Sequence, residues 1–389
     1  MLLNRLAACT AIGSVAALSL GCPPDEVDPD ELDIVYVSAN PPDPGWVTIQ
    51  GTSLNQQDWE IAEPPRPDYA HVNPTFSPDG ELIAYERRVF DAGDEVGRLF
   101  VVDPTEGAQV ELSDLGHDER CRMLPRGWHP DGEQVAFVCD PVDSGQPRQI
   151  GWVNLEGETT QIEPDGTLTE FTEVRWSSDD DLIAVASRDD DTRALVRIDP
   201  DDVDDPEEIT TFEDDRFIDG LHLSDDGTTA AMIRATDETS PAIRPHGSVI
   251  VADLDDGTTT ELLADDDGAT AAGHHSIQRF HPDGERLLVA TGGFQHDPGP
   301  LRIIDIDDDN EQTTLADDDD LDFGTIRGAD ISPDADLVVF SDNDSDEDDP
   351  IRWREGRLHT VGADGDDLQR FDELSVPNAT NQPAFNPEM

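Results

Sequence analysis

The sequence predicts an all-β protein, a seven-bladed β-propeller made of four-stranded antiparallel blades. A short turn phrase recurs along the 389-residue chain, and an apolar run of strand length follows nearly every copy. The last copy has no such run, whereas the beginning of the chain has strands without the phrase. Repetition, strand pattern and complementary ends together predict a closed ring over residues 33–389.

The turn phrase recurs at intervals of about 50 residues, which is typical of repeat folds. Its copies are FSPDG from Phe76, WHPDG from Trp128, WSSDD from Trp176, LSDDG from Leu223, FHPDG from Phe280, ISPDA from Ile331 and FNPEM from Phe385. Proline presets φ at the first corner, aspartate hydrogen-bonds back to the backbone, and glycine takes the left-handed position. Each copy therefore predicts a tight turn between two antiparallel strands.

The segments after each turn predict the rest of a blade. Six turns lead into apolar runs such as LIAYERR, LIAVASR and RLLVATG, which are typical of buried strands. A third run ends in an acidic turn, as in RLFVVDPTEG, and a fourth, mostly polar run such as EITTF follows. This gradient from apolar to polar favours a blade that runs from the centre of the ring to its outside.

The two ends of the chain predict one shared blade. ELDIVYVSAN, GWVTIQGTS and QDWEIAE predict a second, third and fourth strand, and FNPEM predicts a first strand alone. We expect residues 384–386 to pair beside residues 34–38. The joint blade would leave no bare sheet edge and would allow the chain to end at Met389.

The turn phrase with its following strand, best seen in PTFSPDGELIA from Pro74, resembles the WD40-like PD40 repeats of the TolB-type β-propeller family. The resemblance covers residues 33–389 and implies the fold. It implies little about activity, because propellers serve many functions. Only about ten residues separate Cys22 from the first expected strand, so the separate N-terminal domain of TolB has no counterpart and a Tol role is not implied.

The composition is extremely acidic, with 90 acidic against 24 basic residues and a formal charge of -66. Every basic residue is arginine. Such a surface repels DNA and RNA, so nucleic acid is excluded as a partner. The charge favours a solvated surface in a salty, halophilic setting. The alternative is calcium binding by the aspartate runs at residues 265–267, 307–309, 317–320 and 346–349.

The first residues predict export. Residues 1–21 contain one arginine and a short apolar stretch, which is typical of a signal peptide and too short for a permanent membrane helix. Gly21 and Cys22 resemble the end of a bacterial lipobox, although Ser19 and Leu20 depart from it. The resemblance implies lipidation at Cys22, an acidic tether at 22–32 and, from Pro23, the outer membrane, facing the periplasm or the surface. Ordinary secretion is the alternative.

The mature domain keeps Cys121 and Cys139, which lie on either side of the HPDG turn. In an oxidising compartment two remaining thiols favour one disulfide. The pair should lie on neighbouring strands of a hairpin. Two buried thiols are the alternative.

A catalytic site is not evident. The G-x-S-x-G elbow of serine hydrolases is absent from the sequence. His274, His275 and His296 are candidate ligands of a divalent metal, and seven-bladed relatives such as oligogalacturonate lyase are similar in having a histidine-rich metal site at the channel. His129 and His281, which take the serine position of the turn phrase, are expected to be exposed turn residues.

The positions ahead of each first strand are expected at the mouth of the central channel. They are His71, Asn73, Glu173, Asp219, His275, Arg327, Asn381 and Gln382. Polar side chains that converge there suit a small ligand or a peptide end. A water-filled pore is the alternative.

These observations favour a non-catalytic, monomeric lipoprotein propeller that needs no cofactor. It would bind an envelope protein or a small ligand through one face and contact the membrane through its lipid alone. The alternative is a metal-dependent carbohydrate-active enzyme of the lyase type, with a site in the histidine-lined channel.

Overall fold

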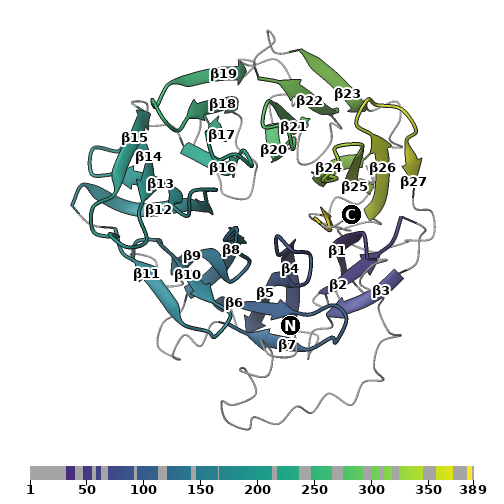
Figure 1. Cartoon of the computed structure of the whole chain (residues 1–389), viewed down its shortest axis with the longest axis horizontal. Coiled ribbons are helices and arrows are strands. Elements are labelled where there is room, and N and C mark those ends of the chain that lie inside the picture. The colour runs from purple at the N-terminus through teal and green to yellow at the C-terminus, as the bar shows by residue number, and fades with distance from the viewer. Residues whose placement is uncertain are drawn as a thin grey trace.

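In the computed structural model of the chain, the described residues contain twenty-eight strands, which form seven blades arranged as a ring (Figure 1). The structure describes residues 32–39, 47–54, 58–62, 69–91, 94–112, 121–141, 146–164, 166–212, 217–235, 247–264, 275–291, 299–306, 311–317, 324–344, 356–370 and 383–387. Within these ranges no helix suited to crossing a membrane is found. The seven-bladed, four-stranded propeller predicted from the sequence is confirmed.

Each blade is a four-stranded antiparallel meander, and one parallel bridge, Val47 with Ala70, links the terminal blade to the first. The inner strands are β4 (Tyr69–Phe76), β8 (Cys121–Trp128), β12 (Leu168–Trp176), β16 (Phe217–Leu223), β20 (His275–Phe280), β24 (Gly324–Ile331) and β28 (Ala384–Phe385). The second strands are β5 (Ile83–Asp91), β9 (Gln134–Pro141), β13 (Leu182–Arg188), β17 (Thr229–Ala235), β21 (Arg286–Thr291), β25 (Leu337–Asp344) and β1 (Ile34–Ala39). The third strands are β6 (Asp94–Val102), β10 (Gln149–Asn154), β14 (Arg193–Ile198), β18 (Gly247–Asp253), β22 (Leu301–Asp305), β26 (Gly356–Gly362) and β2 (Val47–Thr52). The outer strands are β7 (Gln109–Glu111), β11 (Thr159–Ile162), β15 (Glu207–Phe212), β19 (Thr259–Leu263), β23 (Gln312–Ala316), β27 (Gln369–Arg370) and β3 (Asp58–Ala62).

The two ends of the chain share one blade, as the sequence predicts. β28 pairs antiparallel with β1, with Phe385 opposite Ile34 and Ala384 opposite Val35. β1 then pairs with β2, and β2 with β3. The last inner strand therefore completes the blade that the first strands begin (Figure 1).

The turn phrase forms the connection between each inner strand and the second strand. In the first copy the Ser77 N–H donates to Leu82 O at 2.8 Å, and Ser77 Oγ donates to Asp79 Oδ1 at 2.6 Å. Gly80 has a φ of 66°, which glycine adopts at little cost. Ser224 and Ser332 bind the aspartates of their own turns in the same way.

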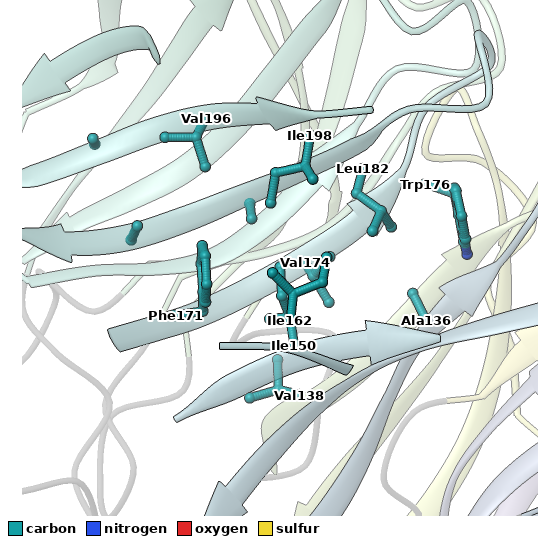
Figure 2. Close-up of a cluster of buried hydrophobic side chains, with 13 residues drawn as sticks. Ala136, Val138, Ile150, Ile162, Phe171, Val174, Trp176, Leu182, Val196 and Ile198 are labelled. Carbon is teal, nitrogen blue, oxygen red and sulfur yellow. The ribbon is translucent and has the colours of Figure 1, made fainter. Parts of the chain in front are cut away.

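The core lies between blades rather than within any one of them. One cluster joins Ala136 and Val138 of β9 to Phe171, Val174 and Trp176 of β12 (Figure 2). The apolar residue that begins each turn phrase packs toward the preceding blade, as Trp176 does against Ala136 and Val138, because side chains alternate along a strand. The residue before it therefore points the other way, toward the next blade around the ring.

Candidate functional site at the inner strands

The inner strands are not acidic, unlike the rest of the chain. They contain five arginines and four carboxylates, although the whole chain has a formal charge of -66. The arginines are Arg122, Arg126, Arg175, Arg279 and Arg327, and the carboxylates are Glu170, Glu173, Asp219 and Asp330. The excess negative charge therefore belongs to the other strands and the loops, where water and salt screen it.

His71 is fully buried between the first and the last blade. Its Nδ1 lies 3.2 Å from Ala62 O of β3, and Arg87 Nε donates to its Nε2 at 2.9 Å. Nδ1 therefore carries the proton and the ring is neutral. Burial, reinforced by the Arg87 charge, lowers the pKa of His71 to about 3. Both ring nitrogens are occupied, so His71 ties two blades together.

Asn73 belongs to a second group in the same blade. Its side-chain amide donates to Glu86 Oε2 at 3.1 Å, while Arg88 Nε donates to Glu86 Oε1 at 3.0 Å. Asn73 has a φ of 55°, and a register shift separates Val72 from Thr75. Asparagine tolerates this left-handed conformation better than most residues, and it marks a β-bulge in the inner strand.

Register shifts also occur in other inner strands. Register shifts lie between Phe171 and Glu173, and between Asp219 and His222. Glu173 is 4% exposed and its Oε2 lies 4.0 Å from Arg175 Nη1. Asp219 is half-buried and accepts the N–H of Gly220 at 2.9 Å. The bulges re-aim these polar residues toward neighbouring backbone and side chains.

The predicted histidine cluster is only partly covered by the structure. His275 is buried at the start of β20, and its Nδ1 lies 3.2 Å from Thr291 Oγ1. Among the described residues no group of three or more metal-ligating side chains comes together. His274, His296, Asn381, Gln382 and the side chain of Arg327 lie outside the described residues, as do nearly all residues of the aspartate runs.

The expectation that His129 and His281 are exposed is wrong. They are 8% and 4% exposed, respectively. His129 packs edge-on against Trp176 of the next blade, and its Nε2 lies 3.2 Å from Asp180 Oδ1. Burial and the charge of Arg286 lower the pKa of His281. An imidazole is larger than a serine hydroxyl. It can therefore accept a backbone N–H of its own turn, as His129 and His281 do, and still contact a residue outside that turn.

Cys139 is disulfide-bonded. It lies opposite Met123 in the β8–β9 ladder, and Cys121 lies opposite Pro141. The cysteines are therefore on adjacent strands, as expected. The side chain of Cys121 lies outside the described residues, so its pairing with Cys139 stays a prediction.

Sequence reasoning did not single out the polar contact that runs through three inner strands. Arg279 Nη1 of β20 donates to Asp330 Oδ1 of β24 at 2.9 Å, and the N–H of Phe385 in β28 donates to Asp330 Oδ2 at 2.8 Å. Arg279 and Asp330 occupy the same position in their repeats, immediately before the apolar residue that begins the turn phrase. This shared position is the signal that could have identified them.

A buried polar pair in the sixth blade was also not foreseen. His359 Nε2 lies 3.3 Å from Asp342 Oδ1, and the His359 ring stacks on Phe340 with centroids 4.9 Å apart. Asp342 is 1% exposed and its carboxylate makes no hydrogen bond. Asp342 occupies the repeat position that Arg87 takes in the first blade.

Comparison with known proteins gives the family and the fold. The model of the lipoprotein LpqB β-propeller domain matches residues 72–298. No curated protein matches the chain. Among solved structures, an oligogalacturonate lyase in complex with manganese is 13% identical, with a TM-score of 0.58 over 87% of this chain and 84% of the lyase.

Two further structures share the fold. A TolB-type protein from Agrobacterium tumefaciens is 15% identical, with a TM-score of 0.50 over 92% of this chain and 95% of that one. Puromycin hydrolase is 15% identical, with a TM-score of 0.59 over 93% of this chain but only 55% of the hydrolase. Identities this low show the propeller fold alone. The family match covers more than half of the chain and agrees with the predicted TolB-like repeats, so the chain belongs to the lipoprotein LpqB β-propeller domain family.

Proposed function

We propose that this protein is a non-catalytic, envelope-anchored propeller that binds a partner protein through the face formed by its turn phrases. One observation carries the proposal: the second, third and fourth turns are bonded to one another, while the carboxylates of Asp180 and Asp226 remain at the surface. The polar side chains of the described inner strands, by contrast, bond mainly to the ring itself, as His71, Asn73 and Asp330 do.

The contacts between turns make the face rigid. Ser178 Oγ of the third turn donates to Asp226 O of the fourth at 2.8 Å. A Cβ on Gly227, whose φ is 71°, would lie 2.3 Å from Ser178 Oγ, so glycine is required for this approach. His129 of the second turn contacts Asp180 of the third. A surface that is already ordered loses little entropy when a partner binds.

The carboxylates on this face are held ready for a basic partner. A hydrogen bond from the Ser224 hydroxyl lowers the pKa of Asp226, and one from Ser332 lowers that of Asp334. Both carboxylates therefore stay ionised at pH values below the usual pKa of aspartate. The side chain of Asp180 is 72% exposed. Arginine or lysine side chains of a partner would complement this arrangement.

Crosslinking can test the proposed face in the native host. A photoreactive residue at Asp180 or Asp334 should capture one defined protein, whereas the same residue at exposed Gln312 on the outer strand β23 should not. Charge-neutral Asp180→Asn and Asp334→Asn should weaken the interaction with the captured protein. Equal capture from Gln312, or no effect of the neutral variants, would rule out the turn face.

Anchoring is part of the proposal and rests on Cys22, which lies outside the described residues. The lipoprotein family and the resemblance of Gly21 and Cys22 to a lipobox support export, cleavage after residue 21 and attachment to the envelope through the 22–32 tether. Pro23, next to Cys22, is our reason for proposing the outer membrane. Cys22→Ser should move the protein from the membrane fraction, from which detergent extracts it, to the soluble fraction. Membrane association that survives this change would contradict the lipid anchor.

A metal-dependent lyase is the outcome that would overturn the proposal. Metal analysis of protein purified without chelators, together with a lyase assay on polygalacturonate, distinguishes the two functions. Stoichiometric metal that is lost in His275→Gln and His296→Gln, together with unsaturated product, would show an enzyme. A metal-free protein that still captures its partner would support the binding function.

A further inference from the structure

The closing strand occupies a slot that recognises it through three hydrogen bonds besides the β1–β28 ladder. The N–H of Asn386 donates to Asp33 O at 2.8 Å, and its side-chain Nδ2 donates to Leu32 O at 3.0 Å. The N–H of Phe385 donates to the Asp330 carboxylate at 2.8 Å. Asp33 is itself positioned, because its side chain accepts the N–H of Leu54 at 2.6 Å. We call this set of acceptors, with the pocket described next, the closing slot.

An apolar pocket completes the closing slot. Phe385 is 3% exposed and packs in one cluster with Ile34 and Tyr36 of β1 and with Val339 and Leu358 of the sixth blade. These pocket side chains come from two neighbouring blades. An aromatic residue followed by asparagine therefore meets both an apolar pocket and a pair of backbone acceptors, which is the pattern of strand-addition recognition.

One hydrogen bond of the closing slot corresponds to a bond that, in the other blades, joins two residues of the same hairpin. In the first turn Ser77 N–H bonds to Leu82 O, five residues later in the same hairpin. Asn386 takes the place of Ser77 and Asp33 takes the place of Leu82, although Asn386 and Leu32 are 354 residues apart. Nothing in this geometry requires that both partners belong to one chain.

The closing strand is also short, and a long segment of chain precedes it. β28 has two residues, whereas β4 and β24 each have eight. Residues 371–382 separate β27 from residue 383. Twelve residues span up to about 40 Å when extended, a length that would allow residues 383–387 to enter a second molecule beside the first.

We propose that the closing slot also accepts residues 383–387 of a second copy of this chain, so that two propellers exchange their closing strands. The second copy is the partner favoured by the structure, because its segment carries the same Phe385 and Asn386 that the slot already holds. Each ring is complete only with a strand, and exchange satisfies both rings at once. Such swapping of an identical element is a low-cost route to a dimer.

Paired cysteines can test the exchange in the full-length chain. Val35 and Ala384 are direct partners in the β1–β28 ladder. One batch carries Val35→Cys and the other carries Ala384→Cys, both in a Cys22→Ser background with the native Cys121 and Cys139 retained. Neither batch can form the 35–384 disulfide within one molecule. After mixing, an intermolecular 35–384 disulfide forms only if the strand of one chain enters the slot of the other.

The expected result is a covalent dimer at least ten-fold more abundant than in a control mixture of Val35→Cys and Gln312→Cys, because Gln312 is exposed on an outer strand. Peptide mapping should identify the 35–384 bond, and adding Phe385→Ala to the Ala384→Cys chain should reduce it to the control level. A dimer no more abundant than the control, or one that tolerates Phe385→Ala, would overturn the proposal. Circular dichroism of each variant checks that the ring remains folded.

Discussion

The backbone N–H of Asn386 donates to the carbonyl oxygen of Asp33 at 2.8 Å and joins the two ends of the described chain. The bond has the same place in its blade as the Ser77 to Leu82 bond has in the first blade. One tight turn of the propeller is thus assembled from two segments that are distant in sequence. The stability of the ring should therefore depend on a few residues at this junction.

The first prediction concerns the Phe385 side chain. Phe385→Ala should lower the free energy of unfolding by about 3 to 5 kcal/mol, the usual cost of removing a buried phenyl ring. Chemical denaturation monitored by tryptophan fluorescence measures the change. Leu54→Ala is the matched control, because Leu54 is a large apolar residue that is 36% exposed. Equal effects of the two substitutions would mean that the ring closes without Phe385.

The second prediction concerns the Asp330 carboxylate, which accepts from Arg279 and from the N–H of Phe385. Asp330→Asn should destabilise the protein by about 1.5 to 3 kcal/mol, the range for hydrogen bonds to a charged group. A double-mutant cycle with Arg279→Met isolates the contact between the two side chains. Additive effects in the cycle would show that Asp330 acts on the closing strand without help from Arg279.

The third prediction concerns pH. The folded-state pKa of His71 is about 3, below the value of 6.5 expected for the unfolded chain. The unfolded state therefore binds a proton that the folded state does not, and stability falls as pH drops below 6.5. Between about pH 6 and pH 4 the wild type should lose up to about 1.4 kcal/mol per pH unit relative to His71→Gln.

Urea denaturation of both proteins across this range gives the comparison. Near pH 7.5 the difference between their free energies of unfolding should not change with pH, since neither protein has a charged group at position 71. If the free energies of unfolding of the two proteins followed parallel curves down to pH 4, His71 would not be a buried neutral imidazole.

The fourth prediction concerns salt. With 90 acidic and 24 basic residues, the surface repels itself at low ionic strength. The melting temperature should rise steadily from about 0.05 M to 2 M NaCl, and KCl should act similarly, because screening is general. A rise that occurs only with calcium and saturates would instead show specific binding by aspartates. No response to any salt would refute the repulsion argument.

Local pattern was enough to predict the blades. The turn phrase specifies backbone conformation residue by residue, and the strand after it specifies which side is buried, so neither depends on distant parts of the chain. The shared terminal blade followed from the same pattern, because FNPEM lacked a second strand and residues 34–38 lacked a first. β28 beside β1 confirms that prediction.

The sequence by itself thus determined the number of blades, their strand order and the closure of the ring. Only the tertiary structure decided what the polar residues around the axis do. His71 looked like a residue open to a ligand but is buried against Ala62, and His129 reaches Asp180 in the next blade. Arg279, Asp330 and Phe385 come from three different blades. Bulges, strand twist and the angle between blades set these contacts, which join residues of different repeats and therefore cannot be read from the pattern of one repeat.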